Sequence, residues 1–455
     1  MSRLFGTDGI RGIANADLSP ELCFRLGRAA ASLLLGNRSS KERRAVIVGR
    51  DTRLSGPMLE AAITAGMTSV GCDVVSIGVV PTPAVACVTR SERAIAGVMI
   101  SASHNPIDDN GIKFFGPDGF KLSDDTEDEI EALLAASNLP RPTGAGVGSA
   151  SIAYNLTRHY YRELYESGVD LRGLGVIVDG AYGAAYAIAP YALRKLGATV
   201  YEIHCEADGE RINVGCGATN LEPLQAAVRA RIDAGENGVI GVAFDGDADR
   251  ALFVDETGSV VSGDHVLFAI GCDLHARGEL TGNAIVATVM SNIGFERALR
   301  KRGIGLVRTP VGDRYVLEAM RAGGYVLGGE QSGHVIDFRR NTTGDGPLTA
   351  ASLLGLVAAR QRGLHELVKD VVVAPQILVN VQTPRKDVLE RPAVQGAIVA
   401  AEARLGGTGR LLIRASGTEP LIRVMAEGDD PALVEQVAAD LAKRIEEEIG
   451  GLTET

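Results

Sequence analysis

The chain lacks the features of membrane and nucleic-acid-binding proteins. No apolar run approaches the roughly 20 residues that a helix needs to cross a bilayer. No run of lysine and arginine offers a track for a phosphate backbone, and the net charge of -11 argues against nucleic acid as a partner. Tryptophan is absent and 56 residues are glycine, so we expect a soluble, loop-rich protein with no membrane partner. If the substrate is anionic, local cations must hold it.

Cysteine is scarce and scattered. The six cysteines form no CxxC pair, which argues against a zinc cluster and against a disulfide framework. Reduced, mostly structural thiols are therefore expected. The first residues also lack a charged segment followed by an apolar one, which is the pattern of a secretory signal. Together these observations predict a cytoplasmic protein.

The length of the chain predicts several domains. A single core stops growing well before 455 residues, so about three or four domains are expected. Apolar runs alternate with helical patterns in three successive stretches, which predicts three similar βαβ-type domains with mainly parallel, mixed sheets covered by helices. Ser19 and Pro20 predict the cap and first turn of a helix that reaches Leu35.

The last segment differs in the order of its elements. A strand, a helix and two strands precede a capped helix after Asp430, in which apolar residues recur at every fourth position. This pattern predicts a smaller α+β domain at the C-terminus. The expected domain boundaries are 1–152, 153–255, 256–368 and 369–455. We expect the four domains to surround a central cleft.

A polar cluster follows a buried strand in each of the three α/β units. The clusters are SASHNP (101–106), DGDADR (245–250) and GGEQSGH (328–334). Parallel α/β sheets bind their ligands outside the carboxyl ends of the strands. The sequence therefore predicts that three distant loops converge on one site.

The DGDADR cluster predicts a metal site. Asp245, Asp247 and Asp249 occupy every second position, so on an extended segment their carboxylates point the same way. Three carboxylates repel one another unless a cation neutralises them, and oxygen ligands without histidine or cysteine favour Mg²⁺ over zinc. A solvated acidic turn is the alternative, which the apolar strand before it makes less favourable.

The same aspartates also match the spacing of an EF-hand calcium loop whose twelfth residue is Glu256. That interpretation fails at two points. The sixth position is Arg250 where the loop needs glycine, and the following ALFV is typical of a strand, where an EF-hand needs a helix.

For Ser103 in SASHNP, the residues alone leave open a phosphorylated serine and a plain turn. Nucleophilic catalysis of the hydrolase type is disfavoured because no G-x-S-x-G elbow is present. If Ser103 carries a phosphoryl group, its oxygens supply a further ligand for a three-aspartate Mg²⁺ site, and His104, Lys113 and Arg11 offset the added negative charge. A plain Ser-His-Asn-Pro turn is the alternative.

Two further loops predict the binding of a sugar phosphate. Glu330, Ser332 and His334 lie among glycines and suit hydrogen bonds to sugar hydroxyls. A phosphate nest is predicted in RASGTEPLIR, whose candidate residues are Arg414, Ser416, Gly417, Thr418 and Arg423. No Walker A pattern occurs, so a nucleotide-driven reaction has no evident phosphate cradle.

These four loops, in this order, resemble those of the α-D-phosphohexomutase superfamily over essentially the whole chain. Within it, FGTDGIRG, SASHNPIDDNGIKFFGPDGFKL, VGDRYV, GGEQSGH and NTTGDG are most similar to the branch that acts on glucosamine phosphates. One departure is CGATN (216–220), where the branch is expected to carry CGSTH-like text. A phosphomannomutase or phosphoglucomutase of the same superfamily is the nearest alternative.

The resemblance implies an intramolecular phosphotransferase, that is, an isomerase. Phosphorylated Ser103 is expected to donate its phosphoryl group to glucosamine 6-phosphate, giving a glucosamine 1,6-bisphosphate intermediate that reorients and leaves glucosamine 1-phosphate. One Mg²⁺ per subunit on Ser103 and the three aspartates, with Arg250 and Arg11 nearby, is expected to stabilise the transferring charge. Synthesis of UDP-N-acetylglucosamine and of cell-wall precursors is the implied role, and a homodimer is the implied assembly.

Lys113 is the expected general acid and base. A lysine packed among cations has its pKa lowered towards the working pH, which suits proton exchange with a sugar hydroxyl. His104 is expected to support the phosphoserine and His334 to position the substrate. Two other classes remain open: a magnesium-dependent sugar phosphatase, and a silent sugar-phosphate-binding regulator, which would have lost Ser103 or an aspartate of the metal loop.

Overall fold

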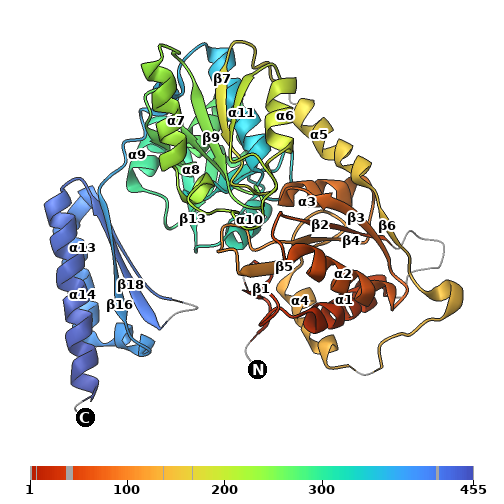
Figure 1. Ribbon diagram of the computed structural model, residues 1–455. Helices are drawn as coiled ribbons and strands as arrows, with labels where there is room; N and C mark the ends of the chain where they lie inside the picture. The colour runs from red at the N-terminus through yellow and green to blue at the C-terminus, as the bar shows by residue number, and fades with distance from the viewer. Residues whose placement is uncertain are drawn as a thin grey trace. The chain divides into compact units, whose positions relative to one another are not determined.

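The computed structural model describes residues 3–6, 8–36, 45–136, 138–166, 168–416 and 420–453 (Figure 1). These residues form two compact units, one within Met1–Thr288 and Val307–Lys369 and the other within Val289–Leu306 and Asp370–Thr455. Three α/β sheets come first along the chain and a small antiparallel sheet comes last, which confirms the predicted fold class. Within the described ranges, no helix is both long and apolar enough to cross a membrane.

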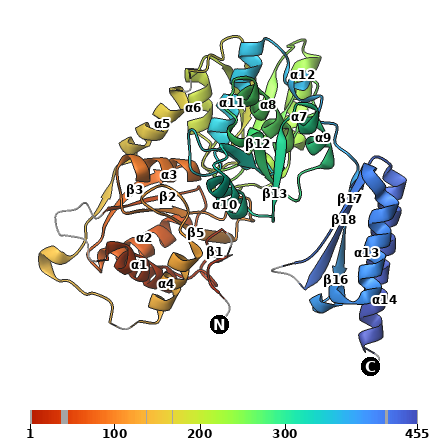
Figure 2. The same cartoon turned by 180° about the vertical axis from the view of Figure 1, so that it is seen from behind.

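The first sheet has six strands and is covered by helices on both faces (Figure 2). Its elements are β1 (Ile10–Ile13), α1 (Pro20–Leu35), β2 (Ala45–Arg50), α2 (Gly56–Thr68), β3 (Asp73–Val79), α3 (Thr82–Ser91), β4 (Ala96–Ile100), β5 (Asp109–Phe115), α4 (Asp124–Leu134), β6 (Ala150–Ile152) and α5 (Arg158–Tyr165). The strand order is β1-β5-β4-β2-β3-β6. Val46 and Val48 of β2 pack with α1 and α2, whereas Ile47 packs with α3 and α5. Burial of both faces explains why these strands are apolar throughout.

Helix α1 begins and ends as the sequence predicts. The Ser19 side chain accepts a hydrogen bond from the Leu22 N–H at 3.3 Å, and Pro20 lies in the first turn. The helix packs closely on α2, because a Cβ at Gly66 of α2 would lie 2.2 Å from the carbonyl oxygen of Phe24. A larger residue at position 66 would therefore separate the two helices.

The second and third sheets follow the same plan. The second, in the order β11-β10-β9-β7-β8, contains β7 (Gly175–Asp179), α6 (Ile188–Lys195), β8 (Thr199–Ile203), α7 (Glu222–Asp233), β9 (Ile240–Phe244), β10 (Ala251–Val254) and β11 (Val260–Val261). The third, in the order β13-β12-β14-β15, contains α8 (Gly263–Ala276), β12 (Ala284–Thr288), α9 (Ile293–Lys301), β13 (Gly305–Thr309), α10 (Asp313–Gly323), β14 (Leu327–Gly329), β15 (Val335–Asp337), α11 (Gly346–Arg360) and α12 (Leu364–Val368). The first two polar clusters follow β4 and β9 directly, and the third begins with the last two residues of β14.

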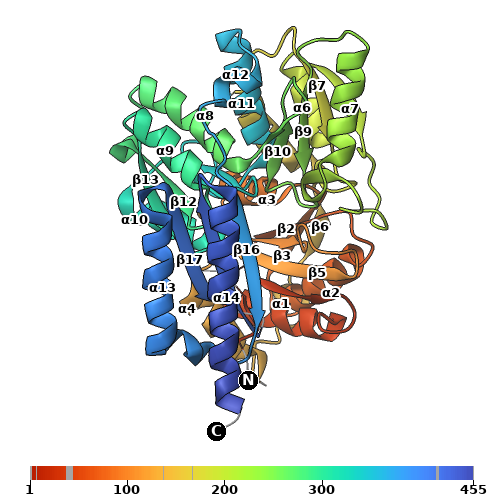
Figure 3. The same cartoon turned by 90° about the vertical axis from the view of Figure 1, so that its left-hand side faces the viewer.

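The C-terminal sheet is antiparallel, with α13 and α14 on one face (Figure 3). Its elements are β16 (Gln376–Gln382), α13 (Pro392–Leu405), β17 (Gly409–Ala415), β18 (Leu421–Gly428) and α14 (Pro431–Thr453). Asp430 Oδ1 accepts the N–H groups of Ala432 and Leu433 at 3.0 and 3.3 Å, which caps α14 as predicted. The smaller α+β domain expected from the sequence is therefore present.

Candidate active site

Ser103 is held in a left-handed conformation at the end of β4. Its φ is +52°, which is uncommon for a residue other than glycine, and its side chain is 1% exposed. The Ser103 N–H donates to Ser101 Oγ at 2.8 Å, and the Ser101 hydroxyl donates to Asp51 Oδ2 at 2.6 Å. Strained backbone persists where its surroundings over-determine it, and such positions cluster at active sites.

A fully buried arginine, Arg53, binds the backbone of the loop that contains Ser103. Arg53 is 0% exposed, and its Nε lies 3.0 Å from Asp51 Oδ2. Its guanidinium donates to the carbonyl oxygens of Ser103, Asn105, Pro106 and Asp109. Burial raises the pKa of Asp51, while Arg53 opposes the shift. This clamp was not predicted, although the GRDTR segment that begins at the end of β2 contains both Asp51 and Arg53.

The three aspartates converge on a turn that follows β9. The strand ends at Phe244, the Ala248 N–H donates to the Asp245 carbonyl at 3.0 Å, and Ala248 has a φ of +56°. The expectation of an extended segment with alternating side chains was therefore wrong. The turn nevertheless gathers one oxygen each from Asp245, Asp247 and Asp249 within 4.8 Å of one another.

The loop does not form a calcium loop of the EF-hand type. Strand β10 follows the aspartates where an EF-hand would have a helix, as the sequence indicates. Glu256 lies outside the aspartate cluster and instead accepts a hydrogen bond from the His365 N–H at 3.3 Å.

Ser103 and the aspartate cluster meet directly. Ser103 Oγ lies 2.6 Å from Asp245 Oδ2. Burial, with Asp249 and Asp247 beside it, raises the pKa of Asp245 well above its usual range. Among the described residues, Asp247 Oδ1 and Asp249 Oδ1 are buried without a hydrogen-bond partner. Buried carboxylate oxygens that lack donors fit a hard divalent cation, so the cluster is compatible with a Mg²⁺ site.

Lys113 lies among carboxylates, which corrects the expectation that cations surround it. On β5, its Nζ is 2.9 Å from Asp247 Oδ2, 3.0 Å from Asp8 Oδ2 and 3.5 Å from Asp249 Oδ2. Burial lowers the pKa of Lys113, but these carboxylates outweigh burial and raise it well above its usual value. The ammonium form is therefore the one that this geometry stabilises.

Arg11 and His104 lie beside the same cluster. Arg11 Nη1 donates to Asn105 Oδ1 at 3.1 Å, and its guanidinium also pairs with Asp8. His104 Nδ1 lies 3.4 Å from Ser103 Oγ. Burial, with Arg250 and Arg11 nearby, lowers the pKa of His104 to about 4, so the ring is neutral at neutral pH.

The loop predicted to bind sugar lies against the metal loop. Arg250 and His334 form an isolated antiparallel bridge, and His334 Nε2 is 4.0 Å from Asp249 Oδ2. His334 is 3% exposed, and neither ring nitrogen has a hydrogen-bond partner within the described part of the chain. Glu330 Oε1 accepts the Gly312 N–H at 3.2 Å, and the Ser332 hydroxyl lies 3.4 Å from Glu330 Oε2. Two acceptors and an unengaged imidazole suit recognition of a polyhydroxylated ligand.

A chain of buried charged residues connects Asp8, beside Lys113, to His334 of the loop predicted to bind sugar. This chain was not predicted. Lys121 Nζ pairs with both Asp8 Oδ1 and Asp313 Oδ2, and Asp313 Oδ2 lies 3.7 Å from His334 Nε2. The three residues belong to FGTDGIRG, GFKL and VGDRYV, segments that were recognised without a role for these side chains. Since each partner is remote in sequence, no local spacing signals the contact.

The predicted phosphate loop lies in the second unit. Arg414 on β17 and Arg423 on β18 are directly opposed in the strand register. Burial and the Arg423 charge lower the pKa of Arg414, so this arginine pair favours an anion between them. Ser416 is buried, and its carbonyl accepts a hydrogen bond from Lys386, a further cation that the sequence analysis missed. Gly417 and Thr418 lie outside the described residues.

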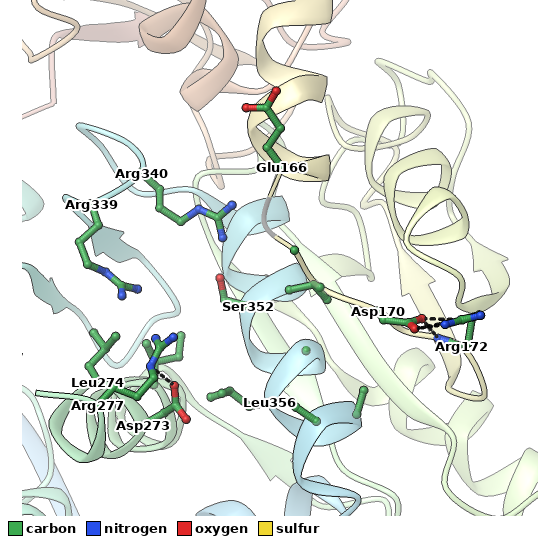
Figure 4. Close-up of a pocket in the computed structure, with 16 residues that line it drawn as sticks. Glu166, Asp170, Arg172, Asp273, Leu274, Arg277, Arg339, Arg340, Ser352 and Leu356 are labelled. Atoms are coloured by element: carbon green, nitrogen blue, oxygen red, sulfur yellow. Dashed lines mark hydrogen bonds and ion pairs between the residues drawn. The ribbon is translucent and has the colours of Figure 1, made fainter. Parts of the chain in front are cut away.

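A cavity of about 710 Å³ lies elsewhere, between the loop that follows α5 and helices α8 and α11 (Figure 4). No predicted site residue is among the described residues that line it. Arg277 pairs with Asp273, Arg339 pairs with Asp337 and Glu279, and Arg172 pairs with Asp170. Carboxylates therefore offset three of the four arginines among the described lining residues, and the fourth, Arg340, donates to the Glu163 carbonyl at 3.0 Å.

Comparison with known proteins matches the whole length of the chain. Family models for the phosphoglucomutase/phosphomannomutase α/β/α domains I, II and III match residues 2–140, 158–258 and 262–374, and the model for the C-terminal domain matches 378–444. Phosphoglucosamine mutase of Symbiobacterium thermophilum is 53% identical over 99% of this chain and 100% of that protein. Phosphoglucosamine mutase of Nocardia farcinica is 50% identical over 98% of this chain and 99% of that protein.

Solved structures share the fold. A phosphoglucomutase/phosphomannomutase family protein of Burkholderia thailandensis superposes with a TM-score of 0.83 at 24% identity, covering 99% of this chain and 98% of that one. N-acetylphosphoglucosamine mutase of Aspergillus fumigatus, in complex with GlcNAc-6P and magnesium, superposes with a TM-score of 0.66 at 19% identity, covering 98% and 96% of the two chains.

Proposed function

This chain belongs to the phosphoglucosamine mutase family, whose members are isomerases, and we propose that Ser103 carries the phosphoryl group between the two ends of glucosamine phosphate. The observation that carries the proposal is the 2.6 Å contact of Ser103 Oγ with Asp245, inside a cluster of carboxylates and beside Lys113. The substrate is a hexosamine phosphate, and the intermediate is glucosamine 1,6-bisphosphate.

We propose that Asp245, Asp247 and Asp249, together with the Ser103 phosphoryl group, hold one Mg²⁺. The buried oxygens without hydrogen-bond donors on Asp247 and Asp249 support this assignment. A bound Mg²⁺ would neutralise charge on the transferring phosphoryl group. Arg250, Arg11 and His104 lie around the cluster and orient the group.

Proton transfer is assigned to Lys113. When the bond from phosphorus to Ser103 Oγ breaks and a bond from phosphorus to the sugar oxygen forms, one proton must pass from the sugar hydroxyl to the serine oxygen. Lys113 Nζ stands 2.9 Å from Asp247 Oδ2, within the same cluster. Its ammonium form supplies the proton to one oxygen, and the resulting amine accepts the proton of the other.

Substrate recognition is assigned to two loops. Glu330, Ser332 and His334 bind the sugar hydroxyls, because they present two acceptors and an imidazole beside the metal loop. The phosphate that is not reacting is bound by Arg414, Ser416, Gly417, Thr418 and Arg423. A homodimer, a cytoplasmic location and a role in supplying UDP-N-acetylglucosamine remain predictions.

The experiment is intact-mass analysis before and after phosphatase treatment, followed by assay of Ser103→Ala with glucosamine 1,6-bisphosphate present. We expect a loss of about 80 Da from the wild type and none from the variant. The activity of the variant should fall by about 10³-fold or more, because the phosphoryl carrier is gone. Ser91→Ala, at an exposed position on α3, is the control and should keep full activity.

Retention of wild-type turnover by Ser103→Ala would contradict the proposal. Turnover of glucosamine, glucose and mannose 6-phosphates, measured side by side, separates this function from that of a phosphomannomutase or phosphoglucomutase. Release of inorganic phosphate in place of isomerised product would instead indicate a phosphatase.

A further inference from the structure

A second group of potential metal ligands lies at the carboxyl ends of β7 and β8. Asp179 is the last residue of β7, His204 follows β8 directly, and Cys216 precedes the short 3-10 helix Gly217–Thr219. A carboxylate oxygen, a ring nitrogen and the thiol sulfur of these residues lie within 4.8 Å of one another. None of the three belongs to the proposed catalytic machinery.

The imidazole of His204 faces the carboxylate of Asp179. His204 Nδ1 lies 3.1 Å from Asp179 Oδ2. A tetrahedral zinc ion with bonds of about 2.0–2.3 Å places its ligand atoms roughly 3.3–3.8 Å apart. The separation of these two atoms is close to that of two ligands of one ion. His204 also has a φ of +52°, a backbone conformation that is costly for residues other than glycine.

The carboxylate is already oriented by its neighbours. Asp179 Oδ1 accepts the Ala181 N–H at 2.9 Å, and Oδ2 accepts the Gly217 N–H at 3.0 Å. Each carboxylate oxygen can accept more than one interaction, so Oδ2 keeps capacity for a cation. Hydrogen bonds of this kind fix ligand orientation around protein-bound metals.

The thiol of Cys216 is a buried member of the group. Cys216 is 1% exposed, so its sulfur is shielded from solvent. Cysteine binds a metal as the thiolate, so binding would release the thiol proton. The His204 side chain is 23% exposed, which leaves a route from solvent to the group.

We propose that Asp179, His204 and Cys216 bind one zinc-type divalent cation, with solvent as the fourth ligand. Nitrogen and sulfur donors select Zn²⁺ over Mg²⁺, whereas the three-aspartate cluster offers only oxygen and selects the reverse. The two sites are therefore chemically distinct. This inference does not depend on the proposed mutase function.

Binding at this group is expected to stabilise the loop that supports Ser103. Asn213, in the segment that leads to Cys216, donates from Nδ2 to the Ser103 carbonyl at 2.9 Å and from its backbone N–H to the Ala181 carbonyl at 3.0 Å. A cation on Cys216 would tie this segment to β7 and β8. The expected effect is a higher melting temperature, because an ion that binds only the folded state stabilises it.

The test is a titration of reduced, chelator-treated full-length protein with Co²⁺, with Mg²⁺ in large excess. We expect about one Co²⁺ per chain with a thiolate-to-cobalt charge-transfer band, and displacement of that band by Zn²⁺. Cobalt at the three-aspartate cluster has no thiolate ligand and gives no such band. Zn²⁺ should raise the melting temperature of the wild type.

Three variants decide the assignment. Cys216→Ser should abolish the band, and His204→Asn should weaken cobalt binding by about 100-fold or more. Cys205→Ser is the matched control, because Cys205 adjoins His204 but lies outside the group, and it should keep the band. If Cys216→Ser fails to fold, His204→Asn with an unchanged circular dichroism spectrum carries the test. Absence of the band in the wild type, its survival in Cys216→Ser, or its loss in Cys205→Ser would overturn the proposal.

Discussion

The Ser103 hydroxyl lies 2.6 Å from Asp245 Oδ2, although 142 positions of sequence separate the two residues. Both are buried; Ser103 lies three residues beyond the end of β4, and Asp245 directly follows β9 of a different sheet. Asp245 is also the member of the aspartate cluster whose pKa is raised well above its usual range, by burial and by Asp249 and Asp247. The contact therefore brings the proposed phosphoryl carrier to a buried carboxylate whose surroundings disfavour its charged form.

Removing the Asp245 carboxylate should raise the melting temperature and lower the mutase activity. Asp245→Asn keeps the polar contact with Ser103 but relieves repulsion from Asp247 and Asp249, so the melting temperature without Mg²⁺ should rise by about 1–2 °C. Mg²⁺ should raise the melting temperature of the wild type but not that of Asp245→Asn. The mutase activity of the variant should fall by about 100-fold or more. Thermal unfolding with and without Mg²⁺ measures the melting temperatures, and a mutase assay measures the activity. Asp208→Asn, at a partly exposed carboxylate, is the control; an unchanged response of Asp245→Asn to Mg²⁺ would contradict the metal assignment.

The buried clamp under the Ser103 loop should be sensitive to a conservative change. Arg53→Lys keeps the charge but loses the planar set of donors to several carbonyl oxygens. We expect the melting temperature to fall by about 3–5 °C and kcat to fall more than KM rises, since the loop and not the substrate site is disturbed. Arg50→Lys is the control, because Arg50 ends β2, is less buried than Arg53 and pairs with Glu60. Equal effects of the two substitutions would argue against a special role for Arg53.

The strand ends and helix caps could be predicted because their signals are local. An apolar run followed by a polar cluster marks each of β4, β9 and β14, and Ser19 and Asp430 cap their helices through neighbours a few residues away. The aspartate loop was predicted for the right residue types but with the wrong backbone, because a turn with Ala248 at positive φ has no distinct sequence signal.

The environment of Lys113 could not be predicted, because it is made by contacts between sheets. Asp247 and Asp249 lie 134 and 136 positions away, and the immediate sequence neighbours of the lysine are apolar or glycine. The resemblance to a family indicated a role for the residue but not the sign of the charges around it. A similar limit applies to Arg53, whose backbone acceptors lie about 50 positions away.

Three cysteines should be inert at neutral pH. Burial raises the pKa of Cys23 and Cys205 to about 12 and that of Cys87 to about 11. A raised thiol pKa leaves a thiolate fraction of roughly 10⁻³ or less at pH 8, and this fraction grows tenfold with each pH unit. Iodoacetamide labelling followed by peptide mapping should therefore find these three unmodified at pH 8, and modified at once in denaturant. Rapid labelling of any of them in the folded protein would contradict the prediction.

Gly344 should be required to make room for the His334 ring. A Cβ at this position would lie 2.2 Å from His334 Nε2, so Gly344→Ala must displace the imidazole. A displacement of about 1 Å can cost 100-fold in rate, and kcat/KM should fall by that order. The melting temperature should fall as well, and His334→Ala combined with Gly344→Ala should restore it. Gly396→Ala on α13, where the added Cβ meets nothing within 4 Å, is the control and should stabilise slightly.

Lys121 should be energetically coupled to Asp313. Its ammonium stands between Asp8 and Asp313, and both ion pairs are largely buried, with side-chain exposures of 13% for Lys121 and 15% for Asp313. Lys121→Met leaves two carboxylates without this cation, and Asp313→Asn leaves an excess positive charge, so each alone should lower the melting temperature by several degrees. The double variant should lose less than the sum, because it removes both charges together. The exposed pair Arg404 and Asp440 provides the comparison, and Arg404→Met should shift the melting temperature by less than about 1 °C. Strict additivity in the Lys121 and Asp313 cycle would show that the chain of charges does not act as a unit.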